Sequence, residues 1–518
     1  MAARCNSEPQ GESRAESGVR VLLRGLLIVA LLASFVYMVV RSLHWPLLAD
    51  AQVMRYANFL IDHGFAPYRE ILDINMPGTY FSDRVAVFLF GTSDLGWRMY
   101  DIFLMLSATV GMIAIAWPTD WLAGLFGGVL FALLHAADGP TGTGERDLFI
   151  TVLMIVGYAF LFYSVRRGRP GWMALLGFCM GMAATVKPTT APLGFLLLAM
   201  AGVVLHKRRV RWMPTILYGL LGAGAAAAIF FGFLLRHHSL AAFIEITRNI
   251  TAYYAGLDRV GWVTLVREIV PRPMRLLFPI GIALAVMNRR EWNWERWALM
   301  LGVAMGAFSY FLQGKGFTHH RYELMAFSLL WFAIEFSIAA RRRGAARWLA
   351  LAGVAVGMAV VVPKCLMQIK DATYAKLFSF TTDAEADLRG IGVERLQGRV
   401  QCLDMTDGCM NALYRLGLVQ NTGVMGDTLY FSADNGSPIV QHYRKLYWDH
   451  LQVDPPDVFL MSNELFLDAP TFDKVQRWPL FAEYLAEHYD LYRERRMDEK
   501  FAYRIYVRKG SFADRPGL

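Results

Sequence analysis

The sequence has few charged residues and few cysteines for its length. Only 18% of its 518 residues are Asp, Glu, Lys or Arg, and its five cysteines form no CxxC or Cys/His spacing of the kind that binds a metal. It contains no P-loop, no glycine fingerprint of a dinucleotide-binding fold and no internal repeat of about 20–50 residues. These absences argue against a cysteine-ligated metal site, the commonest nucleotide-binding folds and a solenoid.

Apolar residues are abundant instead: 55% of the chain is hydrophobic, 14% is aromatic, and the mean hydropathy is positive. A soluble core does not need so many, whereas each membrane crossing takes about 20 apolar residues. The formal net charge of +9 could indicate a nucleic-acid-binding protein. However, the Lys and Arg residues form short clusters between apolar runs, which is typical of membrane proteins and argues against nucleic acid as a partner.

The apolar residues fall into about eleven runs, each of which predicts a transmembrane helix. The first run, Val21–Val40, follows several arginines, and Ala49-Asp50-Ala51 offers a cleavage site, so a cleaved signal peptide is the alternative. Its uninterrupted part, Gly25–Val40, is slightly longer than the usual apolar region of a signal peptide, and many runs follow it, which favours an uncleaved helix. The later runs are Ile102–Ala116, Leu122–Leu134, Phe149–Tyr163, Trp172–Ala184, Leu193–Leu205, Ile216–Leu235, Leu276–Met287, Trp297–Phe311, Leu324–Ala339 and Trp348–Val362.

Short basic clusters predict the orientation of the chain. They follow the even-numbered runs, and the N-terminal tail, residues 1–20, also carries arginines. Because cytoplasmic loops are enriched in Lys and Arg, we predict that these segments are cytoplasmic. We therefore predict a transmembrane domain over residues 21–363 and an extracytoplasmic domain over residues 364–518. The clusters are Arg166–Arg169, Lys207–Arg211, Arg289–Arg290 and Arg341–Arg343.

The first outer loop, residues 42–94, carries two further helical patterns. Asp50–His63 and Tyr80–Phe90 have apolar residues at helical spacing, and each is followed by a glycine. Between them, Pro77-Gly78 predicts a turn. We predict two amphipathic helices that lie in the plane of the membrane interface.

The C-terminal segment alternates strand-like and helix-like pieces. Arg399–Met405, Asp457–Met461 and Tyr503–Arg508 read as strands, and Pro438–Leu451 reads as an amphipathic helix. We therefore predict an all-α polytopic membrane domain followed by a small C-terminal α/β domain. Cys402 and Cys409 could pair there or remain two free thiols, and the sequence favours neither.

Two aspartates of the first outer loop are candidate catalytic residues. Asp50 follows the first span at the start of a helix, where a carboxylate can cap the helix or take a proton from an attacking hydroxyl. Asp73 precedes the Pro77-Gly78 turn and could either cap that turn or act on a substrate. We predict both as catalytic candidates, with the neighbouring Tyr68 and Asn75 in support.

Cationic groups gather at the outer ends of several spans. Arg146 stands beside Asp147 at the start of the fourth run, Lys187 ends the fifth run, and Lys315 and His319-His320 share a short outer turn. Taken singly, each has an ordinary structural explanation. Arg146-Asp147 could be a helix start, Lys187 a lysine that extends to the membrane interface, and Lys315 with His319-His320 a solvated loop. Together they would stabilise a leaving phosphate, and Asp147 would support them. Adjacent histidines are a weak metal signal, so we predict neither a metal nor another cofactor.

These residues occur in an arrangement that resembles the GT-C fold glycosyltransferases, in particular the bacterial branch related to protein mannosyltransferases and the lipid A aminoarabinose transferase. The resemblance covers roughly residues 22–340, whereas the C-terminal domain matches only in its placement. The segments that carry it are the loop-opening Asp50, Ala66–Tyr80, Gly144–Asp147, Val186–Pro188 and Lys315–His320.

The resemblance implies an activity. Such proteins transfer a sugar, with inversion, from a polyprenyl-phosphate donor to an acceptor outside the cytoplasm, and their first-loop aspartate, here Asp50, is the base. It implies a glycan, lipid or protein acceptor, contact with membrane lipids, and a bacterial inner membrane with the C-terminal domain in the periplasm. The chain departs from the pattern at Ala51, where many members have glutamate, and at Met76, where aminoarabinose-type members have lysine. The resemblance therefore does not define the acceptor.

A transporter or flippase for lipid-linked sugars and a non-catalytic envelope-assembly protein are the alternatives. Transporters usually carry inverted repeats and ionisable groups near the membrane midplane. This sequence has no convincing repeat, and its ionisable residues cluster toward one membrane face. That distribution favours chemistry at the interface.

Overall fold

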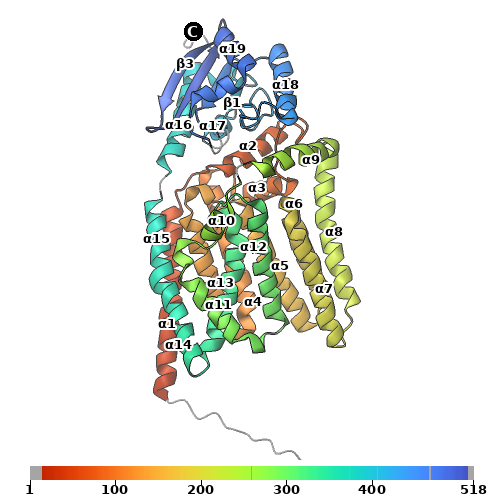
Figure 1. Ribbon diagram of the computed structural model, residues 1–518, viewed down its shortest axis with the longest axis vertical. Helices are drawn as coiled ribbons and strands as arrows, with labels where there is room; N and C mark the ends of the chain where they lie inside the picture. The colour runs from red at the N-terminus through yellow and green to blue at the C-terminus, as the bar shows by residue number, and fades with distance from the viewer. Residues whose placement is uncertain (1–13, 258, 373, 405–406, 466–467, 512–518) are drawn as a thin grey trace, which may run out of the picture.

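The computed structural model describes residues 14–257, 259–372, 374–404, 407–465 and 468–511. It consists of a long helical bundle with a smaller domain at one end, which we call the outer domain (residues 375–511) (Figure 1). Most of the predicted N-terminal tail, residues 1–13, lies outside the described residues, and residues 14–20 already belong to the first helix.

Long apolar helices make up the bundle. Within the described ranges, seven helical segments are long and apolar enough to cross a membrane. The protein is therefore embedded in a membrane. These segments lie in α1 (Arg14–Ser42), α4 (Asp94–Ala137), α5 (Arg146–Arg167), α7 (Ala191–Lys207), α8 (Met213–Arg236), α13 (Tyr322–Ala340), and α14 (Ala345–Val356) with its continuation α15 (Val362–Asp371).

The remaining predicted runs are also helical. The 44-residue α4 contains Pro118 and a non-helical Asp120, so this one element holds two of the predicted runs on either side of a kink. Three shorter or less apolar helices hold the others, and each predicted run therefore centres on a helix. These are α6 (Met173–Val186), α11 (Leu277–Met287) and α12 (Trp294–Gln313).

The first outer loop forms α2 (Asp50–Asp62) and α3 (Pro77–Phe90). The predicted Pro77 turn is instead the first residue of α3, a position that proline favours because its missing N–H is not needed there. Nearly all of α2 is buried, since the membrane domain lies below it and the outer domain lies above it (Figure 1). The prediction of a simple interfacial helix was incomplete because it left out that cover.

The outer domain contains a sheet that, in the part of the chain described, has four strands in the order β1-β2-β4-β3. β1 (Val400–Leu403) runs parallel to β2 (Val458–Ser462), and β4 (Ala502–Arg508) pairs antiparallel with both β2 and β3 (Tyr489–Arg496). The three predicted strands are present, although Met405 lies outside the described residues. The sequence analysis did not predict β3, because its many charged residues obscure the alternation of apolar and polar residues that is typical of a strand.

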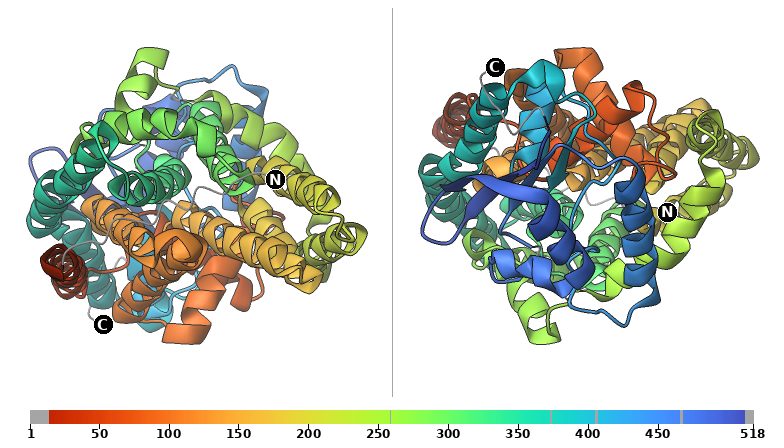
Figure 2. Two further views of the ribbon diagram at one scale, coloured as in Figure 1. Left: turned by 90° about the horizontal axis from the view of Figure 1, so that it is seen from below. Right: turned by 90° about the horizontal axis from the view of Figure 1, so that it is seen from above.

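Helices surround this sheet and link it to the bundle. Figure 2 shows the outer domain from above, lying across the end of the helical bundle. The predicted helix from Pro438 is present and extends to Val453. The helices of the outer domain are α16 (Ala375–Ile391), α17 (Cys409–Leu416), α18 (Pro438–Val453) and α19 (Pro479–His488). α9 (Leu240–Gly256) contacts α18, and α10 (Trp262–Glu268) lies within the bundle (Figure 1).

Cys402 and Cys409 form a disulfide that joins β1 to the start of α17. This resolves the alternative that the sequence left open. Cys179 and Cys365 are free and buried. A disulfide is typical of proteins or domains that face an oxidising compartment.

Removing this disulfide should loosen the outer domain. Replacing both cysteines by serine frees a short loop in the unfolded chain, so we expect the free energy of unfolding of this domain to fall by about 2–3 kcal/mol. Pulse proteolysis across a urea series measures that change, and reduced wild-type protein should give the same midpoint. An unchanged midpoint in the double variant would contradict the expectation.

Candidate functional site

Charged and polar side chains meet at the end of the bundle that the outer domain covers. They come from the first outer loop, the start of α5, the end of α6, and the turn His319–Arg321 that precedes α13. These segments are far apart in the sequence. The sequence-predicted residues are therefore brought together by the packing of the bundle.

Asp50 is the first residue of α2, and its side chain is 30% exposed. The position before it, Ala49, is the N-cap, so Asp50 does not play the capping role that the sequence left open. An oxygen of the Asp50 carboxylate lies 3.4 Å from Nη2 of Arg146. The aspartate is thus accessible and paired with a cation.

Asp73 is buried, and each of its carboxylate oxygens accepts a hydrogen bond. Oδ1 accepts from the backbone N–H of Asn75 at 3.0 Å and from its side-chain Nδ2 at 2.8 Å, and Oδ2 accepts from the Tyr80 hydroxyl at 2.8 Å. Burial raises the pKa of Asp73 despite these bonds and the nearby charge of Arg146. The carboxylate is held firmly in place.

Asn75 connects the two aspartates. Its side-chain oxygen accepts a hydrogen bond from Nη1 of Arg146, and its backbone carbonyl accepts one from the Tyr68 hydroxyl at 2.6 Å. A continuous chain of contacts thus runs from Asp73 through Asn75 and Arg146 to Asp50.

Asp147, which is buried, and the partly buried Lys187 form an ion pair beside this chain. His319 and His320 stand close by, so that one ligand atom from each histidine and from Asp147 lie within 4.8 Å of one another. Oδ2 of Asp147, Nε2 of His319 and Nδ1 of His320 find no hydrogen-bond partner among the described residues. These atoms have the donor set for a divalent cation, although the Lys187 ammonium on Asp147 competes with one.

Lys315 lies at the edge of the group. Its ammonium nitrogen is 4.8 Å from the centre of the Tyr254 ring. Its charge and that of Lys187 both act on the His320 ring. The cationic residues predicted from the sequence therefore surround one polar region.

Two buried acids in this region were missed. Glu145 is the N-cap residue of α5 and is 4% exposed, and Glu323 at the start of α13 is 1% exposed and feels the charges of Lys187 and Asp147. The available signals were the neighbouring Arg146 for Glu145 and, for Glu323, an acid at the edge of an apolar run.

Burial raises the pKa of Glu145 well above its ordinary value, and the charge of Asp50 adds to the effect. The folded protein keeps this proton to a higher pH than the unfolded chain does. Glu145 therefore reduces stability progressively as the pH rises above about 4.5, the ordinary value.

Glu145→Gln should remove this dependence. We expect the variant to melt at a higher temperature than wild type at about pH 8 and at nearly the same temperature at about pH 4. Thermal unfolding in detergent measures both values, with the exposed Glu487→Gln as the control. An equal difference at both pH values would show that Glu145 is not the titrating group.

Comparison with known proteins identifies the fold. No protein-family profile and no curated protein sequence matches this chain. Its structure is similar to that of ArnT from Cupriavidus metallidurans bound to undecaprenyl phosphate, with a TM-score of 0.58 and 14% identity over 93% of this chain and 98% of that chain. The apo state of ArnT gives a TM-score of 0.55 at 14% identity over 95% and 98% of the two chains.

A second similar structure is the oligosaccharyltransferase of Archaeoglobus fulgidus tethered to an acceptor peptide. Its TM-score is 0.51 at 11% identity, over 90% of this chain and 72% of that chain. Both neighbours are GT-C fold glycosyltransferases. The chain therefore has the GT-C fold with a C-terminal sheet domain, which confirms the fold that the sequence resemblance implied.

Proposed function

We propose that this chain, a membrane protein with the GT-C fold, is an inverting glycosyltransferase. It moves a sugar from a polyprenyl-phosphate donor to a glycan, lipid or protein acceptor at the periplasmic face of the bacterial inner membrane. The observation that carries the proposal is the gathering of an accessible carboxylate, Asp50, with the cations Arg146 and Lys187 at one end of the bundle. The lipid-phosphate ligand in the ArnT structure supports the donor class.

An apolar cavity supports a lipid-linked donor. It has a volume of about 480 Å³ and lies among α6, α7 and α8, lined largely by glycine, alanine, leucine and phenylalanine. Its lining includes Met76, which follows Asn75, and Thr185 and Pro188, which lie on either side of Lys187 in the chain. A prenyl tail in this cavity would leave its phosphate beside the cations.

The chemistry uses the residues already described. Asp50 takes the proton of the acceptor hydroxyl while that oxygen attacks the anomeric carbon and the bond from this carbon to the phosphate oxygen breaks. Polyprenyl phosphate leaves with the bonding electron pair. Its negative charge is stabilised by the cations Arg146, Lys187 and Lys315 and by the two histidines, His319 and His320, which offer N–H donors.

In this proposal Asp73 positions Asn75 and does not act as the base. Its oxygens accept hydrogen bonds from Asn75 and Tyr80 and it is only 6% exposed, so an acceptor hydroxyl reaches it less readily than it reaches Asp50. It holds Asn75 against Arg146 instead, and Tyr68 fixes the backbone of Asn75. Asp147 similarly holds Lys187. No step requires a metal.

Asp50→Asn should nearly abolish turnover while the protein stays folded. A general base contributes about 10²–10⁴ in rate, so we expect a loss of that size in sugar transfer from a radiolabelled polyprenyl-phosphate donor. The matched control is Asp62→Asn at the other end of α2, whose carboxylate pairs with Arg84 on the surface. Undiminished turnover in Asp50→Asn would refute the assignment of the base.

Filling the apolar cavity should weaken donor binding. Gly224 lines the cavity, and an added Cβ there meets no other atom within 4 Å, so Gly224→Leu occupies the space without a clash at its base. We expect the donor KM to rise by about tenfold or more for a long prenyl chain and to change little for a short one.

Gly232→Leu is the control for this variant. Gly232 lies in the same helix with equally free space at its Cβ, and it does not line the cavity. If both leucine variants have the same donor KM, the cavity does not hold the tail.

A further inference from the structure

The outer domain contacts the first outer loop at several points, and two of these contacts lie just before the aspartates of the site. One contact is made by α17 at Leu47, three residues before Asp50. The other is made by residues 418–424 at Leu72, immediately before Asp73. Each aspartate therefore follows, within three residues, a backbone position that the outer domain holds.

At the first contact, the backbone of Leu47 is held at both its polar atoms. Nδ2 of Asn411 donates to the Leu47 carbonyl at 2.9 Å, and the Leu47 N–H donates to an oxygen of Asp94 at 3.3 Å. Arg415 donates to the other oxygen of that carboxylate. Asn411 is only 2% exposed, so this hydrogen bond is shielded from water.

The backbone between Leu47 and Asp50 needs such support. Ala49 has a φ of 51° and a ψ of −134°, a combination that residues other than glycine rarely adopt. Such a residue remains in place only when the surrounding structure holds it there. The direction in which Asp50 points thus depends on the contacts that hold Leu47.

At the second contact, the two backbones lie side by side. The Leu72 N–H donates to the Gly423 carbonyl at 3.1 Å, and Leu72 forms a parallel bridge with Val424. A Cβ at position 423 would lie 2.0 Å from the Glu70 carbonyl oxygen. Only glycine permits this approach.

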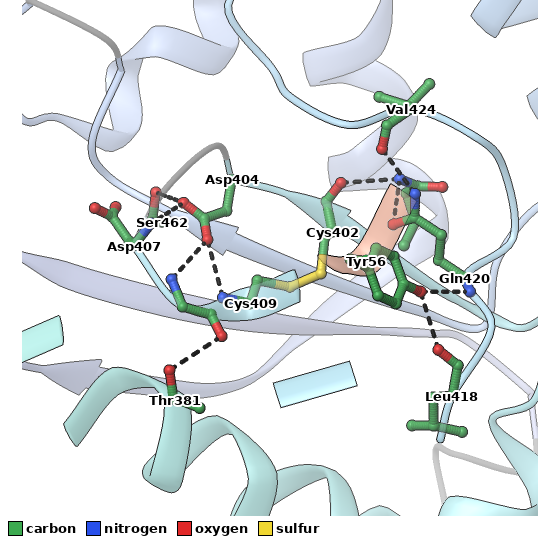
Figure 3. The surroundings of a disulfide bond; sticks show 12 residues. Tyr56, Thr381, Cys402, Asp404, Asp407, Cys409, Leu418, Gln420, Val424 and Ser462 are labelled. Atoms are coloured by element: carbon green, nitrogen blue, oxygen red, sulfur yellow. Dashed lines mark hydrogen bonds between the residues drawn. A yellow bond between two sulfur atoms is a disulfide. The ribbon is translucent and has the colours of Figure 1, made fainter. Parts of the chain in front are cut away.

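A disulfide and a tyrosine join the two contacts (Figure 3). The disulfide ties Cys409, the first residue of α17, to Cys402 on β1. Tyr56 of α2 donates to the Leu418 carbonyl and accepts from the Gln420 N–H, each at 2.9 Å. The segment from Cys409 to Val424 is thus a continuous support on which the first outer loop rests.

We propose that Asn411 and Gly423 are positioning residues of the transferase. Through Leu47 and Leu72 they set where the two aspartates stand relative to Arg146. The outer domain is thereby part of the active-site framework and not a separate module. The effect of these residues on catalysis rests on the proposed function, whereas their effect on the position of the first outer loop does not.

Asn411→Ala and Gly423→Ala test the proposal in the full-length protein in lipid nanodiscs. Asn435→Ala and Gly390→Ala are the matched controls, because both residues are exposed in the outer domain and neither contacts the first outer loop. Hydrogen–deuterium exchange of peptides covering residues 44–52 and 68–76 reports on the loop. Transfer from the polyprenyl-phosphate donor reports kcat and KM.

Each test variant should speed exchange in the segment that it contacts, and the controls should match wild type. kcat should fall by about tenfold or more, because small misplacements of reacting groups are costly, while the donor KM changes by less than about twofold.

Wild-type exchange rates in both segments of the test variants, or an unchanged kcat despite faster exchange, would overturn the positioning role. A wild-type protein without transfer activity would overturn the proposed function, and the exchange data would then decide the loop contact alone. If Gly423→Ala does not fold, Asn411→Ala carries the test.

Discussion

The site depends on one cation, the guanidinium of Arg146, which joins Asp50 to Asn75 at the N-terminal end of α5. An arginine at a helix N-terminus opposes the helix dipole, and a largely buried charge without partners is strongly destabilising. Asp50 on one side, Asn75 on the other and the neighbouring acids offset that cost. Because the partners come from the first outer loop, the loop and the bundle cannot take up independent positions. The same contacts leave Asp50 accessible and Asp73 fixed.

Much of the fold could be predicted from the sequence because apolar runs in a membrane protein are long and their meaning is simple. The runs around Ile102 and Leu122 were recognised as two spans, and the structure joins them in one kinked helix. The sequence did not predict elements whose conformation or burial is determined by tertiary packing. β3 has the charged sequence Tyr489–Arg496, and its pairing with β4 determines its conformation. The burial of α2 could not be foreseen because it depends on a domain more than 300 residues away in the chain.

The candidate site was predictable in its residue types and less so in its connections. Charged residues at span ends are costly, so Asp50, Arg146 and Lys187 stood out. The hydrogen bonds of Asp73 to Asn75 and Tyr80 could not be read from spacing, since they depend on how the chain turns before α3. Glu145 and Glu323 were overlooked because a single acid next to an apolar run has no distinctive pattern. Their burial is a property of the assembled bundle.

The close approach at Gly423 has a consequence for how such chains can be recombined. The Glu70 carbonyl occupies the space where a Cβ at position 423 would lie. The surfaces of the outer domain and of residues 42–94 are therefore complementary at this point. A chimaera that exchanged the outer domain alone would bring a mismatched surface against Leu72. A working chimaera must therefore exchange the first outer loop together with the outer domain, although the two segments are far apart in the sequence.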